Sequence, residues 1–378
     1  MILALFVATL VPLVILYIIY TLDLYKTGTF KYVLLCVVCG IAAYLVARQI
    51  NYELYMHSIL KRKEIIRYAA PVIEETLKAL VLIYLVRRPN FTYFVDGAIY
   101  GFAAGIGFAV VENYEYLAGL QGAGLGLAIS RVLSSNLIHA SASATIGIAF
   151  GLGRFERPLR RVLVMVAGWL MAILLHSIFN HITLAVSGGM LLVYAAVLGL
   201  GAAGLIAFVI SRGLAEEKSW IEEKLGDADR VTQKEAAMVQ KLSNLQEILA
   251  PLAERFGAQK AEQIEKFLVI QARLGILRKT LDKLNDEKMR TAVEKQMADL
   301  RTQMDDARRA VGSYCMLYLR NIFPEDASPL WGILEQRIQE KIAARPTTGG
   351  ANLFAKLGER VAKPAEPTPN QDPPAGQT

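Results

Sequence analysis

The chain has 378 residues, 54% of them hydrophobic, and a mean hydropathy of +0.36. This composition excludes an ordinary soluble protein, because apolar runs of such length need a bilayer to cover them. The formal charge of +7 falls largely in short loops and at the ends of apolar runs. That distribution suits membrane topology and anionic lipid, and it does not indicate nucleic-acid binding.

The first part of the chain is predicted to be an all-α, polytopic membrane bundle with about seven spans. The predicted spans cover residues 2–22, 32–50, 68–85, 94–118, 127–152, 162–186 and 189–211. Between the second and third spans, residues 51–67 mix basic and apolar side chains at helical spacing. That pattern predicts an amphipathic helix at the membrane surface.

The composition divides the chain into three predicted regions. Residues 1–212 form the transmembrane domain. In residues 213–345, apolar side chains recur at three-and-four spacing among charged ones, which predicts a soluble helical domain. Residues 346–378 are rich in proline and poor in apolar groups, so they are predicted to be a disordered tail.

The charge of the loops predicts the orientation. Loops after the third, fifth and seventh spans are basic, whereas those after the fourth and sixth carry no charge. Because basic loops stay in the cytoplasm, we expect a multi-pass protein of the cell inner membrane with a cytoplasmic C-terminus. The basic segment 51–67 falls outside by strict alternation, which leaves the topology of the first two spans open. The extension would bind a cytoplasmic partner that the sequence does not identify.

Two adjacent carboxylates and an ammonium interrupt the third predicted span, at Glu74, Glu75 and Lys78. Each charged side chain near the centre of a membrane helix costs roughly 2.5–3.5 kcal/mol on insertion scales. Ionisable groups kept at that cost indicate a functional site. The alternative is an ion pair between Glu74 and Lys78, which lie four residues apart, that only holds helices together.

Four further polar side chains lie well inside the predicted spans: Glu112, His139, His176 and Asn180. Consecutive spans run antiparallel, so the starts of the third and fifth and the ends of the fourth and sixth share one membrane face. At about 1.5 Å per residue, these carboxylates and imidazoles lie at similar depth in the same half of the bilayer. They are therefore predicted to converge. Asp96 and Arg131 lie near span starts and are interpreted as groups at the membrane boundary.

Small residues are predicted to bring the fourth and fifth spans close together. Gly97, Gly101 and Gly105 recur every four residues on one helix face. The residues that follow His139 are almost all alanine and serine. Such faces allow close approach of helix backbones, or leave room for water.

Two chemistries are compatible with these residues. A carboxylate beside an imidazole can act as general base toward a trapped water, while a second His or Asn donates to the oxyanion. No cofactor is then required. The alternative is a divalent metal such as zinc, whose N and O ligands would come from Glu74 or Glu75, Glu112, His139 and His176. The zincin motif H-E-x-x-H is absent from the sequence.

Two other classes of protein could use such groups. Buried Glu and His residues also form proton relays in proton- or ion-coupled transporters, but a relay needs a polar path across both leaflets. Here the polar groups cluster in one half of the bilayer. A non-catalytic membrane scaffold is the third possibility, in which the cluster only joins the helices.

Four motifs on successive spans carry a resemblance to a known family. They are Glu74-Glu75-x-x-Lys78, Phe108-x-x-x-Glu112, His139 with Gly147, and His176-x-x-x-Asn180. In this order they resemble the PrsW family of intramembrane proteases, which are distant relatives of the CAAX prenyl endopeptidases. The resemblance covers residues 67–187 and does not extend to the soluble region.

The resemblance implies an intramembrane endopeptidase that cleaves a membrane-anchored protein substrate. The best-known substrate type is the anti-sigma factor of a stress-signalling pathway, cut in a site-1-type cleavage. It also implies Glu74, Glu75 and His176 as the main catalytic set, with Glu112 and His139 in support. The CAAX endopeptidases carry His where this chain has Glu112, so a metal-free glutamate protease and a metalloprotease both stay open. In the second case the ligands would be Glu75, Glu112, His139 and His176.

Our mechanistic hypothesis assigns one role to each group. Glu75 polarises water together with His176, and Glu74 orients the water or shares the proton. Asn180 or His139 stabilises the oxyanion. Lipid bilayer and a membrane-anchored substrate are the expected partners.

Overall fold

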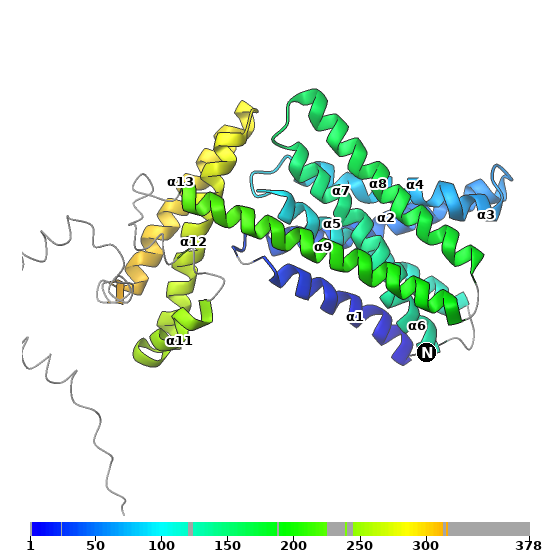
Figure 1. Cartoon of the computed structure of the whole chain (residues 1–378), viewed down its shortest axis with the longest axis horizontal. Coiled ribbons are helices and arrows are strands. Elements are labelled where there is room, and N and C mark those ends of the chain that lie inside the picture. Colours follow the sequence, from blue (N-terminus) through cyan, green and yellow to red (C-terminus); the bar gives the residue numbers. More distant parts are fainter. Residues whose placement is uncertain are drawn as a thin grey trace, which may run out of the picture. The chain divides into compact units, whose positions relative to one another are not determined.

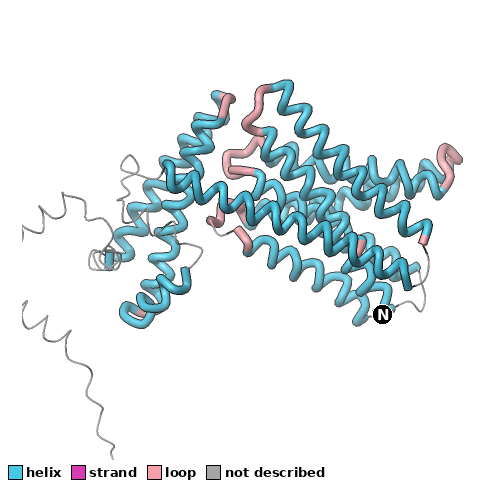
Figure 2. The backbone as a smooth tube through the Cα atoms, in the orientation of Figure 1, coloured by secondary structure: helices cyan, strands magenta, loops and turns pink. Residues whose placement is uncertain are grey.

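The computed structural model describes residues 2–23, 25–119, 124–186, 189–224, 239, 245–312 and 315–316. Every regular element within these residues is a helix (Figure 2), as predicted for an all-α membrane bundle. Met1–Asn321 form one compact unit. The predicted tail at 346–378 lies outside the described residues.

The helices follow one another in the order shown in Figure 1. Those of the membrane part are α1 (Ile2–Thr21), α2 (Phe30–Met56), α3 (Arg62–Glu64), the π-helix η1 (Ile65–Ala69), α4 (Ala70–Leu85), α5 (Phe94–Gly119), α6 (Gly124–Leu133), α7 (Ser135–Gly153), α8 (Pro158–Ala185) and α9 (Gly189–Lys224). Those of the extension are α11 (Leu245–Phe256), α12 (Ala258–Lys283) and α13 (Glu287–Val311).

Five helices of the described part are long and apolar enough to cross a membrane, judged by length and composition. They are Ile2–Thr21, Phe30–Met56, Phe94–Gly119, Pro158–Ala185 and Val193–Lys224. The two other predicted spans, 68–85 and 127–152, are also helical but fall outside this set. Their helices α4 and α7 carry the charged and polar residues, and most side chains of α7 are buried among neighbouring helices. A helix enclosed in this way needs no continuous apolar surface.

Two local predictions were wrong. The helix of residues 51–67 does not form as a separate element, because α2 continues to Met56 and only a short α3 follows. Helix growth adds one hydrogen bond per residue, so continuing α2 is favourable. The span at 127–152 is interrupted at Ser134, which separates α6 from α7. The third span is helical as predicted, but it begins with the π-helical turn of η1, which no spacing rule predicts.

The contact of α5 with α7 is backbone against backbone, as the glycine spacing predicted. A Cβ atom on Gly97 would lie 2.1 Å from the carbonyl oxygen of Gly147, and one on Gly101 would lie 2.2 Å from that of Ser143. A Cβ atom on Gly105 would lie 2.4 Å from the carbonyl oxygen of His139. No larger side chain fits at these positions, and the close approach sets Glu112 on α5 beside α7.

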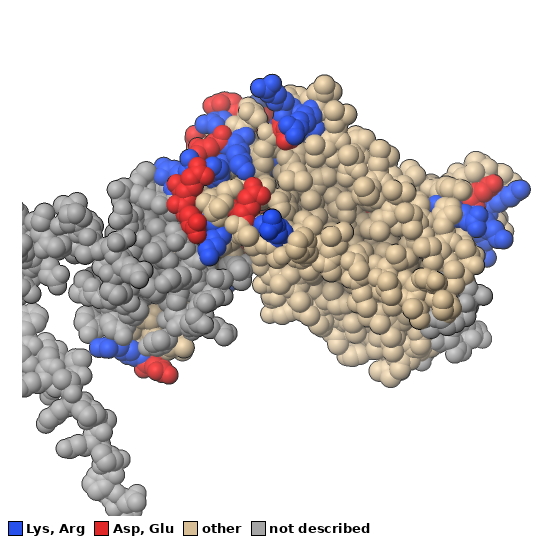
Figure 3. Space-filling view, viewed as in Figure 1, with Lys and Arg blue, Asp and Glu red and all other residues tan. Residues whose placement is uncertain are grey.

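The surface agrees with burial in a bilayer. On the face shown in Figure 3, charged side chains gather around α3 and around the extension, and a broad uncharged surface lies between them. Large apolar side chains such as Leu170, Leu174 and Phe208 are exposed on α8 and α9. Exposed apolar area of this kind is stable only against lipid or another protein.

The extension is a helical hairpin packed against the end of α9. Val293, Met297 and Leu300 on α13 are buried, and Asp286 caps α13 by accepting a hydrogen bond from the amide of Met289 at 2.9 Å. The ammonium of Lys283 on α12 lies 3.9 Å from the centre of the Trp220 ring. Helix α9 runs without interruption through residue 212, and the three-part division of the chain stays a prediction.

Candidate functional site

The charged residues of α4 form an ion pair different from the one that the sequence suggested. The ammonium Nζ of Lys78 lies 2.6 Å from Oε1 of Glu75, three residues earlier, and both side chains are fully buried. The expected pairing of Lys78 with Glu74 does not occur. Three- and four-residue separations both share a helix face, so the sequence alone could not choose between them.

Both carboxylate oxygens of Glu75 are engaged. Oε1 also accepts a hydrogen bond from Nδ1 of His176 at 2.9 Å, and Oε2 accepts one from the hydroxyl of Ser143 at 3.3 Å. Glu75 therefore joins α4 to α7 and α8. Because Nδ1 of His176 carries the proton in this bond, Nε2 of the neutral ring has a free lone pair.

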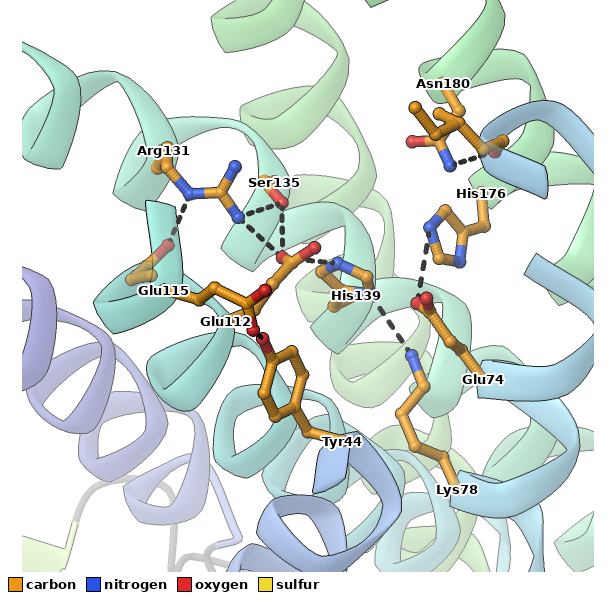
Figure 4. A network of polar contacts seen from close by, with 12 residues as sticks. Tyr44, Glu74, Lys78, Glu112, Glu115, Arg131, Ser135, His139, His176 and Asn180 are labelled. Carbon is orange, nitrogen blue, oxygen red and sulfur yellow. Dashed lines mark hydrogen bonds and ion pairs between the residues drawn. The ribbon is translucent and has the colours of Figure 1, made fainter. Parts of the chain in front are cut away.

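His139 lies between a cation and a carboxylate (Figure 4). Its Nδ1 is 3.3 Å from Nζ of Lys78, and its Nε2 is 3.1 Å from Oε2 of Glu112. An ammonium only donates, so Nδ1 accepts and Nε2 of the neutral ring donates to Glu112. The rings of His139 and His176 meet edge to face, with centroids 4.6 Å apart.

Glu112 is held by a second cation, Arg131. One guanidinium nitrogen of Arg131 lies 2.5 Å from Oε2 of Glu112, and its Nε donates to the side chain of Asn113 at 2.8 Å. The hydroxyl of Ser135 is 3.4 Å from the same carboxylate oxygen. The sequence interpretation of Arg131 as a boundary group missed this role. The available signal was an arginine near the start of a span that carries a histidine.

Glu74 is the carboxylate of the cluster that the hydrogen bonds described above do not engage. Its Oε2 is buried and makes no hydrogen bond to the described residues, and it lies 3.8 Å from Nε2 of His176. The cluster places the carboxylates of Glu74, Glu75 and Glu112 against the permanent cations of Lys78 and Arg131. Glu75 and Glu112 are paired directly with these cations, whereas Glu74 has no direct cationic partner among Lys78 and Arg131.

The arrangement suits a metal ion. Ligand atoms from Glu74, His139 and His176 lie within 4.8 Å of one another, and all three residues are buried. Two imidazoles and a carboxylate are a donor set that catalytic zinc accepts while one position stays open. The orphaned carboxylate oxygen of Glu74 also favours a cation. The ligands expected from the residues, Glu74 or Glu75 with Glu112, His139 and His176, include all three members of this group. The narrower set of Glu75, Glu112, His139 and His176 shares only the two histidines with it.

Asn180 stands apart from the cluster. It lies one turn after His176 on α8, and its side-chain amide donates to the backbone carbonyl of Ile66 in η1 at 2.8 Å. Five of the six predicted site residues are thus linked to one another or lie within 4 Å of a linked residue. Asn180 is bonded to the backbone beside them (Figure 4).

Comparison with known proteins agrees with the motifs. The family described as PrsW family intramembrane metalloprotease matches residues 29–211. The chain is 34% identical over 117 residues to Protease PrsW of Clostridioides difficile, which covers 30% of this chain and 49% of that protein. It is 28% identical over 168 residues to Protease PrsW of Geobacillus kaustophilus, covering 44% of this chain and 73% of that protein.

A third relative, Protease PrsW of Bacillus subtilis, is 32% identical over 116 residues, which is 30% of this chain and 52% of that protein. The chain thus spans about half the length of two of these three relatives. No solved structure gives a significant match. Every residue of the cluster lies within the matched segment, so it is the part of the chain that carries the site, residues 29–211, that resembles the PrsW family.

Proposed function

We propose that the chain is an intramembrane endopeptidase that hydrolyses a peptide bond of membrane-anchored protein substrates. The observation that carries the proposal is the buried, unbonded Oε2 of Glu74, which faces Nε2 of His176 at 3.8 Å. The names of the relatives support the reaction class. Hydrolysis of a peptide bond needs a base that takes a proton from water, and a carboxylate without another partner is suited to that task.

The hydrogen bonds support an exchange of the roles that the sequence suggested for the two glutamates. Glu75 accepts bonds at both oxygens, so it is a poor base toward water. Its bond to Nδ1 fixes the tautomer and the ring orientation of His176. We therefore assign the general base to Glu74 and the orientation of His176 to Glu75. The proton taken up by Glu74 is later donated to the leaving amine.

A divalent metal fits the same residues, and in that alternative mechanism Glu74 is a ligand in place of a free base. Glu74, His139 and His176 would hold it, and Glu75 and Glu112 would orient the two imidazoles, as carboxylates do around zinc-binding histidines. When bound, zinc supplies a Lewis acid that polarises the scissile carbonyl. Lys78 donates to the Nδ1 lone pair of His139, so binding through that atom requires the ammonium to turn away.

The finer assignments rest on the resemblance and on loop charge. We propose location in the bacterial inner membrane with a cytoplasmic C-terminus, and an extension that binds a cytoplasmic partner. An anti-sigma factor cut in a site-1-type cleavage is the proposed substrate class.

The test is cleavage of a transmembrane reporter by purified protein in liposomes. Wild type, Glu74→Gln and the control Glu115→Gln are compared, each with and without a strong chelator. Glu115 lies on the same helix as Glu112 but bonds to Tyr44 and Arg48 outside the cluster. Cleavage should be lost in Glu74→Gln and kept in Glu115→Gln. Loss in chelator, with recovery on adding zinc, would select the metalloprotease, whereas cleavage that persists in chelator would select the metal-free mechanism.

Should Glu74→Gln cleave at the wild-type rate, the assignment of the base is wrong. Bound zinc, measured by inductively coupled plasma mass spectrometry, gives a second readout that does not depend on the reporter. About one ion per wild-type chain and clearly less in His176→Ala would support the ligand group.

A further inference from the structure

The helix that carries the two glutamates begins with a π-helical turn. In η1, the amide of Ala70 donates to the carbonyl oxygen of Ile65, five residues earlier. A π turn inserts one extra residue, which rotates the following helix by about 100° relative to an uninterrupted α-helix. The turn therefore decides which side chains of α4 face α8.

This turn leaves a carbonyl group without a donor from its own helix. The carbonyl of Ile66 would bond to the amide four or five residues ahead. The amide of Ala70 is already used by Ile65, and residue 71 is Pro71, which has no N–H. An unpaired backbone carbonyl inside a membrane protein is costly.

Asn180 supplies the missing donor from another helix. Its Nδ2 lies 2.8 Å from the carbonyl oxygen of Ile66, and both residues are half-buried. Asn180 lies one turn beyond His176, the histidine that bonds to Glu75. Helix α8 is thus attached to the α4 segment at two points, one at the π turn and one at the carboxylate (Figure 4).

We propose that Asn180 is a positioning residue that satisfies the carbonyl freed by the π turn and Pro71. In doing so it fixes the rotation of α4, so that Glu74 and Glu75 face His176. The effect on activity rests on the proposed function, but the effect on the π turn does not. An oxyanion donor at this position would act on substrate directly, and its loss would not depend on Pro71.

The first experiment measures hydrogen exchange of residues 65–70 in liposomes by mass spectrometry. Asn180→Ala is compared with wild type and with Ser177→Ala, a control one turn earlier on the same helix. Loss of one hydrogen bond should raise exchange at Ala69 and Ala70 by about tenfold, and Ser177→Ala should leave it unchanged. Asn180→Asp, which keeps the size but removes the donor, should give the same increase and serves if the alanine variant does not purify.

The second experiment tests rescue. Pro71→Ala restores an N–H at position 71, which can replace the lost donor. Asn180→Ala should lower the cleavage rate about tenfold. In the double variant Asn180→Ala/Pro71→Ala, the cleavage rate and the hydrogen exchange should both return to within about threefold of the values for Pro71→Ala alone. Unchanged exchange in Asn180→Ala, or an equal loss of cleavage in both backgrounds, would overturn the proposal. If wild type cleaves no reporter, the proposed function fails and the exchange data still decide the role of Asn180.

Discussion

The two adjacent glutamates should respond in opposite ways to loss of their charge. Glu75 is the counter-ion of Lys78, and both side chains are fully buried. Breaking a buried ion pair by removing one partner costs about 3–5 kcal/mol, because the other charge stays buried and unpaired. Glu75→Gln keeps the size of the side chain and should therefore lower the free energy of unfolding by about 3 kcal/mol.

Glu74→Gln should leave stability unchanged or raise it slightly. The carboxylate oxygen Oε2 has no hydrogen bond to the described residues to lose, and the amide that replaces the carboxyl group has the same size and no charge. Cleavage should nevertheless fall by about 10²–10⁴-fold, the contribution typical of a general base. Stability and activity are thus expected to separate between two neighbouring residues.

A third variant distinguishes the ion pair from other effects of the substitution. In Glu75→Gln/Lys78→Met the unpaired ammonium is gone, so most of the lost stability should return. Activity should not return, because His176 still lacks the carboxylate that orients it. Unfolding would be followed by titration with SDS in mixed micelles, and cleavage in liposomes. The reasoning is refuted if Glu74→Gln is the less stable of the single variants, or if the double variant is as unstable as Glu75→Gln.

Three further outcomes are expected. Arg131→Met should slow cleavage about tenfold. In a chain that already carries Glu112→Gln it should have little effect, because the arginine then has no carboxylate charge to balance. Initial cleavage rates of wild type, the two single variants and the double variant measure this coupling. His176→Ala should abolish cleavage without unfolding the chain, as circular dichroism and elution volume would report. Burial, together with the charge of Asp96, raises the pKa of Asp23 to about 7. Because the folded state favours the protonated carboxyl group of Asp23, this group contributes stability at acid pH, and the contribution is lost as the pH rises through 7. Asp23→Asn should therefore flatten the fall in melting temperature between pH 5 and 8, and an unchanged profile would contradict the assignment.

Convergence of the polar groups followed from the sequence because it depends only on depth and on the antiparallel order of the spans. Glu112 and His139 lie on different helices, yet their distances along those helices were enough to predict contact. The glycines of α5 added the reason for the close approach, since a Cβ at Gly105 would collide with the backbone at His139.

The detailed contacts of the site depend on breaks in the helices. The sequence pattern does not predict these breaks. The π turn before α4 decides which side chains of that helix face α8. The pairing of Lys78 with Glu75 could not be foreseen, because three- and four-residue separations both share a helix face. The interruption at Ser134 starts a new helix after Arg131 and lets the guanidinium reach Glu112. The sequence pattern predicts one continuous helix over residues 127–152, and such a helix would leave Arg131 at the membrane boundary.

Glu112 and Arg131 are best understood as one unit. A carboxylate beside His139 adds a negative charge to a cluster that already holds Glu74 and Glu75, and repulsion between them would otherwise favour protonation. Arg131 balances that charge at 2.5 Å, at the same oxygen, Oε2, that accepts the hydrogen bond from His139 (Figure 4). Glu112 can then stay ionised and accept the hydrogen bond from Nε2 of His139 at 3.1 Å. A glutamate at this position therefore depends on the arginine, and the chemistry of the site stays with Glu74.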